Sequence, residues 1–183
     1  MNSDGKHPVS VRLVAFLVGV LAISNAPLFS YASVSPLTEF TFFLHDNLLT
    51  FNSSAYALIP PLLSGPPNSF FGGFFVFDDS MTLLSDPSSE EIGRGRGLYL
   101  GDAQDTLAIG LLYVWTAQFN EPSGYGNGTT LSFAGFFRNK EALSIVGGTG
   151  KFKMARGWAD LLIYSFAGVS AVLEVTVHFT YGY

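Results

Sequence analysis

The stretch Val169–Tyr181, VSAVLEVTVHFTY, decides the fold. All of its odd-numbered positions are apolar, and its even-numbered positions are polar apart from Val172. A period of two, rich in β-branched and aromatic residues, predicts a β-strand with one face toward a core. A helix would not sort these residues onto two faces.

Similar but less regular segments precede this strand. They are Thr38–Asp46, Phe70–Phe77, Arg94–Gly101, Thr106–Gln118, Thr129–Phe136, Leu143–Val146 and Lys151–Ile163. The breaks between them carry turn residues, as in Glu121–Gly124 and Gly147–Gly150. About eight short strands without an amphipathic helix predict an all-β domain, a barrel or a sandwich. We favour an eight-stranded antiparallel β-barrel, because closure removes edges that an aromatic-rich sheet would otherwise expose.

The composition excludes several classes of function. The chain has 183 residues, 13% of them charged, with a formal net charge of −5 and no basic run, so nucleic acid is not an expected partner. It has no cysteine, which rules out disulfides, zinc fingers, thiol nucleophiles and iron–sulfur clusters. With only His7, His45 and His178, a multi-histidine metal site is not expected, and we expect no cofactor.

The first 32 residues have the features of a signal peptide. The apolar run Leu13–Ile23 follows Lys6 and Arg12, and its 11 residues are too few to span a bilayer core of about 30 Å. Ser30 and Ala32 fit a cleavage site after Ala32. We therefore expect a secreted protein whose single domain covers residues 33–183, the alternative being an uncleaved membrane anchor.

Two sequons agree with secretion. Asn52-Ser53-Ser54 and Asn127-Gly128-Thr129 are acceptors for N-glycosylation, which requires a surface position. We predict that Asn52 and Asn127 lie in exposed loops and are glycosylated.

Strand parity places four charged residues on apolar faces. Asp46 is in register with Phe42 and Leu44, and Asp78 is in register with Val76, while Gly93, Gly95 and Gly97 form the face opposite Arg94 and Arg96. An acid in an aromatic cavity can have a raised pKa and donate a proton. We therefore predict that the catalytic residues are Asp46, Asp78 and Arg94 and that the substrate contacts Phe42, Leu44, Val76, Arg96 and Leu98. The alternative is that these charges face water or form structural ion pairs.

Five motifs in a fixed order resemble the plant dirigent proteins over essentially the whole mature chain. The first is the aromatic strand ending in His45-Asp46, and the second contains Asp78-Asp79. The third and fourth are Ile92–Tyr99 and Phe133–Gly135, and the fifth and most specific is the block formed by Ile145–Phe152 and Met154–Gly157. Each motif is weak alone, and the order makes the resemblance specific.

The resemblance implies a fold and a chemistry. Dirigent proteins are eight-stranded barrels that assemble as trimers, with acidic residues and an arginine in an apolar pocket. They do not oxidise their substrate. A separate laccase or peroxidase makes phenoxy radicals from monolignols such as coniferyl alcohol, and the barrel orients two radicals so that one stereoisomer of a lignan or lignin precursor forms. A carboxylic acid can protonate the quinone-methide intermediate. For this chain we therefore expect no oxidative activity of its own and a location in the apoplast.

The chain departs from the dirigent pattern at some positions. Arg96 stands where the family has glutamine, and Tyr164 stands near the position of an aspartate in lignan-forming members. The loop acid of the family corresponds to Asp86, Glu90 or Glu91. Two other interpretations stay open: a cell-wall scaffold that localises lignin polymerisation without stereocontrol, and an enzyme related to allene oxide cyclase.

Overall fold

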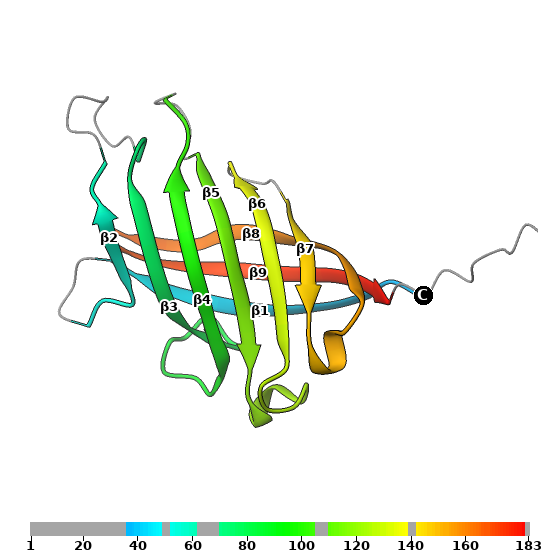
Figure 1. Cartoon of the computed structure of the whole chain (residues 1–183). Coiled ribbons are helices and arrows are strands. Elements are labelled where there is room, and N and C mark those ends of the chain that lie inside the picture. The colour runs from blue at the N-terminus through cyan, green and yellow to red at the C-terminus, as the bar shows by residue number, and fades with distance from the viewer. Residues whose placement is uncertain (1–35, 49–51, 62–69, 105–109, 139–141, 182–183) are drawn as a thin grey trace, which may run out of the picture. The chain divides into compact units, whose positions relative to one another are not determined.

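The described chain is almost entirely β-structure (Figure 1). The computed structural model describes residues 36–48, 52–61, 70–104, 110–138 and 142–181, so the predicted signal peptide lies outside them. The strands are β1 (Thr38–Asn47), β2 (Ala55–Ile59), β3 (Phe74–Thr82), β4 (Glu91–Gly101), β5 (Leu111–Phe119), β6 (Thr130–Phe137), β7 (Ala142–Gly148), β8 (Ala155–Ala167) and β9 (Ser170–Tyr181). Two 3₁₀ helices, η1 (Glu121–Ser123) and η2 (Gly150–Phe152), follow β5 and β7. In this part of the chain no helix has the length and hydropathy needed to cross a membrane.

The strands form one antiparallel sheet that closes on itself. Its order is β1-β9-β8-β7-β6-β5-β4-β3-β2, and a further pairing of β1 with β3 closes a ring of eight strands. The predicted eight-stranded antiparallel barrel is therefore confirmed. The short strand β2, which the sequence did not predict, pairs with β3 beside the closure.

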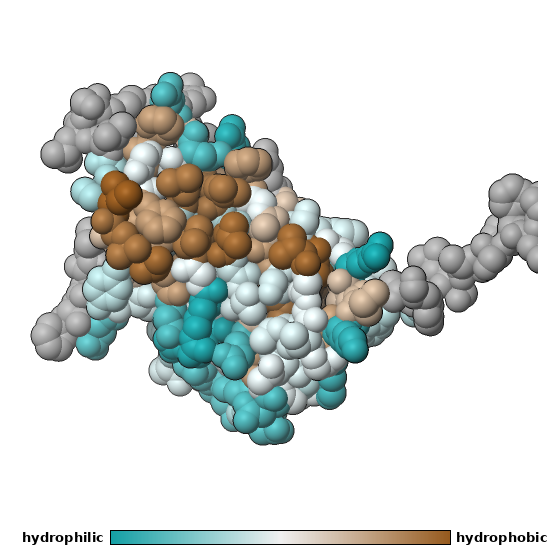
Figure 2. Space-filling model, viewed as in Figure 1, coloured by the Kyte–Doolittle hydropathy of each residue, from teal (hydrophilic) through white to brown (hydrophobic). Residues whose placement is uncertain are grey.

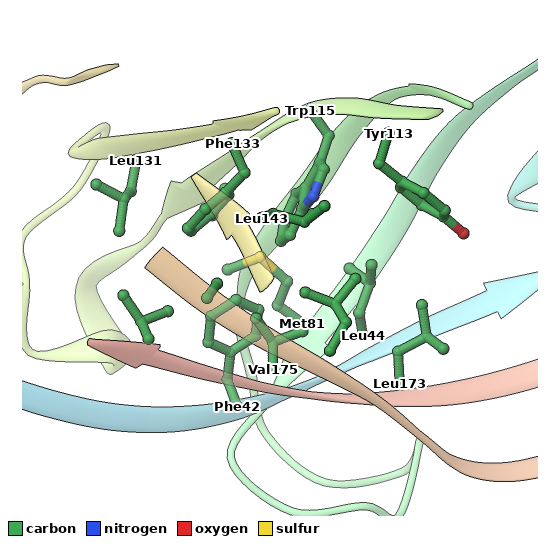
Figure 3. Close-up of a cluster of buried hydrophobic side chains, with 14 of the residues drawn as sticks. Phe42, Leu44, Met81, Tyr113, Trp115, Leu131, Phe133, Leu143, Leu173 and Val175 are labelled. Carbon is green, nitrogen blue, oxygen red and sulfur yellow. The ribbon is translucent and has the colours of Figure 1, made fainter. Parts of the chain in front are cut away.

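Large apolar side chains fill the barrel. Phe42 and Leu44 from β1 meet Met81, Trp115 and Phe133 across the interior (Figure 3). One end is filled by a group of aromatic rings in which neighbouring centroids lie 4.9–6.0 Å apart, namely Phe40, Phe119, Tyr125, Phe152 and Phe179. The other end is hollow, and the candidate site lies there.

The glycines of β4 face the interior. A Cβ atom at Gly95 would lie 2.5 Å from Cδ1 of Leu44, and one at Gly97 would lie 2.4 Å from Cβ of Trp115. Such distances are shorter than van der Waals contact, so only glycine leaves room for these two neighbours. The glycine face thus allows close packing, and it is the inner face of β4. Since side chains alternate along a strand, Arg94 and Arg96 point outward.

The outer face of β3–β6 is divided into apolar and polar halves, as Figure 2 shows. The apolar half consists of two cross-strand rows, Phe74–Leu100–Leu112–Phe136 and Val76–Leu98–Val114–Ala134. The next two rows are polar, Asp78–Arg96–Thr116–Ser132 and Ser80–Arg94–Gln118–Thr130. We call the first two rows the apolar outer patch.

Candidate functional site

A cavity of about 520 Å³ occupies the hollow end of the barrel. We call it the apolar cavity, because apolar and aromatic side chains make most of its wall and Asp46 is its one charged side chain among the described residues. Its lining is Asp46, Leu48, Ala57, Pro60, Pro61, Phe70, Phe75, Tyr99, Leu111, Tyr113, Phe137, Ile163, Phe166, Gly168, Val169, Ala171 and Leu173. The volume lies within the range of small-molecule sites.

Two aspartates bring polarity to this apolar environment. Asp46 extends the inward register of Phe42 and Leu44, and Asp79 extends that of Phe75 and Phe77. The hydroxyl of Tyr99 donates a hydrogen bond to Asp46, and the hydroxyl of Ser54 donates one to Asp79. In each carboxyl group Oδ1 is buried and, within the described residues, has no hydrogen-bond partner. We call Asp46 and Asp79 the acid pair.

Burial changes the proton affinity of both acids. It raises the pKa of Asp46 to about 6, although the hydrogen bond from Tyr99 acts in the opposite direction. Burial, assisted by the nearby charge of Asp46, raises the pKa of Asp79 to about 8. Burial also raises the pKa of Tyr99 and of Tyr113. At mildly acidic pH the pair therefore holds protons that it can donate.

Asp78, Arg94 and Arg96, the other charged residues predicted for the cavity, have outward-facing side chains and do not line the apolar cavity, but Asp78 and Arg94 line, together with Asp46, a second cavity of about 740 Å³ in the barrel wall. Asp78 accepts from Nε of Arg94 at 2.8 Å and lies 3.1 Å from Nε of Arg96, and all three side chains are at least a third exposed. Although slight burial acts to raise it, the two guanidinium groups hold the pKa of Asp78 below its ordinary value. Asp78 and Arg94 thus form a surface ion pair, and Asp79 takes the inward position that we assigned to Asp78.

The predicted substrate contacts also need correction. Val76 and Leu98 belong to the apolar outer patch, and Arg96 lies beside it in the next row. Of these three, Val76 also lines the second cavity in the barrel wall. Phe42 and Leu44 do face inward, but both are fully buried in the filled part of the barrel and line no cavity described here. Both faces of β3 are apolar, so parity alone could not tell which one turns inward.

Other acids and the predicted pocket arginine lie away from the apolar cavity. Asp86 and Glu90 are exposed, and Glu91 pairs with Arg94 at 3.2 Å. Tyr164 points outward, with its ring 5.3 Å from that of Phe43. Among the residues that the structure describes, no arginine lines this cavity, and no three histidine, aspartate or glutamate side chains come together as metal ligands.

The sequence analysis missed Asp79, Tyr99 and Tyr113 as site residues. Asp79 is 1% exposed and is the register partner of Gly95. The run of glycines in β4 was a sequence signal for the crowded face on which both residues lie. Tyr99 and Tyr113 are register partners on β4 and β5 whose rings stack with centroids 5.1 Å apart. Only the structure shows that these rings reach the mouth of the barrel.

Both predicted glycosylation sites are in loops. Asn52 precedes β2, and Asn127 lies between η1 and β6, and both residues are exposed. Glycosylation itself stays a prediction.

Fold and site together define an antiparallel barrel that encloses an aromatic cavity with a buried acid pair. The sequence model described as dirigent-like protein matches residues 37–180. Dirigent protein 1 of Arabidopsis thaliana is 30% identical over 175 residues, 93% of each chain, and pterocarpan synthase 1 of Glycine max is 30% identical over 80% of this chain and 85% of its own. A solved structure of a pterocarpan synthase dirigent protein superposes with a TM-score of 0.70 at 28% identity, covering 81% of this chain and 93% of that one. The chain belongs to the dirigent family.

Proposed function

We propose that this protein directs the stereochemistry of coupling between monolignol phenoxy radicals that a separate laccase or peroxidase produces, in lignan or lignin biosynthesis. The observation that carries the proposal is the acid pair, of which Asp46 lines the apolar cavity and Asp79 is buried near it. Flat phenolic rings match the aromatic wall by shape and by stacking. Holding two radicals in one orientation selects one coupling geometry without any oxidation by the protein.

The acid pair acts after coupling. A protonated carboxyl of Asp46 donates its proton to the carbonyl oxygen of the quinone methide, which makes the exocyclic carbon electrophilic. A hydroxyl of the other half attacks that carbon, and its proton returns to the carboxylate. Protons and electrons balance, and the ring closes without net consumption of the acid. Tyr99 positions Asp46 through its hydrogen bond.

The relatives support a second candidate function. Curated relatives and a solved structure bear the name pterocarpan synthase, at 28–30% identity. The second candidate function is therefore the formation of a pterocarpan in the apolar cavity, with the acid pair as the source of protons.

The coupling assay decides between these candidates. Coniferyl alcohol and a laccase are incubated with and without the protein, and the products are separated by chiral chromatography. We expect an excess of one enantiomer with the protein, and nothing consumed without the laccase. Asp46→Asn and Asp79→Asn should return the product to the racemic background, since a general acid contributes about 10²–10⁴-fold. Asp160→Asn, which changes an exposed acid on β8, is the matched control.

Two results would contradict the coupling function. Racemic product across several monolignols would exclude stereocontrol and leave the wall-scaffold interpretation. Formation of a pterocarpan by the protein would favour the second candidate.

The proposal includes assembly as a homotrimer and action outside the cell. The apolar outer patch supports assembly, because large exposed apolar surfaces usually mark interfaces. Phe136→Glu should reduce the mass found by light scattering to that of one barrel, while Ser144→Glu on exposed β7 should not.

The predicted signal peptide and the exposed positions of Asn52 and Asn127 support secretion. Mass spectrometry of protein secreted by a plant host tests both glycosylation and the cleavage site.

A further inference from the structure

A second cavity, of about 740 Å³, lies in the barrel wall where β1, β2 and β3 meet. We call it the polar cavity. Its lining is His45, Asp46, Asn47, Asn52, Ser53, Ser54, Tyr56, Val76, Phe77, Asp78, Ser80, Pro87, Arg94, Ser170, Ala171 and Val172. Phe77 faces the interior of the barrel, whereas Val76 and Asp78 face outward. The polar cavity therefore extends from the outer surface into the wall.

The wall is incomplete at this place. Among the described residues, β1 pairs with β3 only at Phe43–His45; beyond them Ser54 donates its backbone N–H to the carbonyl oxygen of Asn47, and Leu48 forms one bridge with Ala55. The side chain of Ser54 takes the place of a ladder partner, since its Oγ accepts from the backbone N–H of Asn47 at 3.0 Å and lies 3.4 Å from the carbonyl oxygen of His45. Water can occupy a gap lined by such polar groups.

Asp46 lies between the two cavities, and Asp79, the other member of the acid pair, is buried near it and lines neither of them. Asp46 and its register partner Ala171 line both of them. Ser54 lines the polar cavity and donates a hydrogen bond to Asp79. The other titratable or charged groups around the pair come from four strands: Tyr99 and Arg94 on β4, Tyr113 on β5, His45 on β1 and Asp78 on β3.

We propose that the polar cavity is a water-filled inlet through which the acid pair exchanges protons with solvent while a substrate fills the apolar cavity, with Ser54 as the positioning residue that relays them. This inference rests on the proposed function, because only a reaction that uses the protons of the acid pair gives the inlet a role. A phenolic ligand in the apolar cavity expels water from that side, so an acid that is ionised when the ligand binds needs another route to take up the proton that it must later donate.

The relay is balanced. Ser54 Oγ accepts a proton from a hydronium ion in the polar cavity and passes its own hydroxyl proton to the carboxylate of Asp79, so one proton is transferred and no electron moves. A serine hydroxyl can rotate, so it can point alternately toward the carbonyl oxygen of His45 and toward Asp79.

A reversible plug tests the inlet. The chain has no cysteine, so Ser170→Cys introduces a single thiol in the wall of the polar cavity, where Ser170 donates to Oδ1 of Asn47 at 2.8 Å. A small polar methanethiosulfonate then fills the cavity, and a reducing agent removes it. Ser144→Cys on exposed β7, labelled in the same way, is the control.

The readout is the rate at which the buried carboxyl proton exchanges for deuterium, followed by the infrared carbonyl band that Asp79→Asn removes. A non-reacting phenol occupies the apolar cavity throughout. We expect labelling at position 170 to slow the exchange at least tenfold, reduction to restore it, and phenol binding to stay unchanged. Labelling at position 144 should change nothing. Unchanged exchange at position 170 would overturn the inlet, and loss of phenol binding would assign the polar cavity to the substrate instead.

A second pair of variants tests the relay. Ser54→Ala removes the hydroxyl but also the sequon of Asn52, and Asn52→Gln removes only the sequon. Slow exchange in Ser54→Ala with normal exchange in Asn52→Gln supports the relay, and equal rates contradict it. The exchange measurement needs no turnover. If the protein gave no stereoselective coupling, the proposed function would be refuted, and the exchange rates would still show whether the polar cavity is an inlet for protons.

Discussion

The protein should lose stability between pH 5 and pH 8, and replacing Asp79 by asparagine should abolish most of this loss. Burial raises the pKa of Asp79 to about 8 in the folded chain, from an ordinary value of 3.8. Over most of this interval Asp79 keeps its proton in the folded state and has lost it in the unfolded state, so the free energy of unfolding falls as pH rises toward the folded pKa. At 1.36 kcal/mol per pH unit, the loss attributable to Asp79 is about 3–4 kcal/mol.

Urea unfolding at the two pH values measures this loss. The Asp79→Asn variant should lose only about 1 kcal/mol, because Asp46 still titrates with a pKa of about 6. Asp78→Asn is the control at the neighbouring position. The pKa of Asp78 lies below its ordinary value, so this acid is ionised at both pH values and its loss should leave the wild-type pH dependence intact. An equal pH dependence in wild type and Asp79→Asn would show that Asp79 is already ionised in the folded barrel.

Two further pairs of variants test the packing of the barrel by thermal and urea unfolding. Leu161→Ala should cost about 2–5 kcal/mol because Leu161 is 2% exposed, whereas Leu162→Ala should change the free energy of unfolding by less than about 1 kcal/mol because Leu162 is 47% exposed. Gly97→Ala should destabilise the barrel by about 2–3 kcal/mol, since its Cβ would lie 2.3 Å from the carbonyl oxygen of Val114; Gly147→Ala, with no atom within 4 Å, should be neutral. Equal effects within either pair would contradict the packing described above.

The sequence was sufficient to predict the barrel because one face of β9 is uniformly apolar. Leu173, Val175 and Val177 are all buried, as the alternation indicates. Strand ends were predicted less well: β3 begins at Phe74 and runs on to Thr82, through the two acids. β2 was missed because a strand of five residues with mostly exposed side chains carries little periodic signal.

The site could be predicted only in part. Asp46 was assigned correctly to the interior, since Phe42 and Leu44 leave no doubt about the inner face of β1. For β4 the apolar residues turned out to lie outside and the glycines inside, because Leu44 and Trp115 from neighbouring strands fill the space that the glycines leave. Which face of a strand turns inward therefore depends on the side chains of neighbouring strands, and the residue pattern of the strand itself carries no information about them.

The closure of the ring by β1 has a consequence for biosynthesis. β1 pairs with β9 along its whole length, so that Thr41 bonds to Thr176, 135 residues further along the chain. During translation β1 leaves the ribosome long before its partner exists. Its apolar side chains and unpaired backbone then remain exposed until β9 is synthesised. Contacts of such high sequence separation make folding slow, and they place it after synthesis of β9, in a period when the nascent chain depends on chaperones.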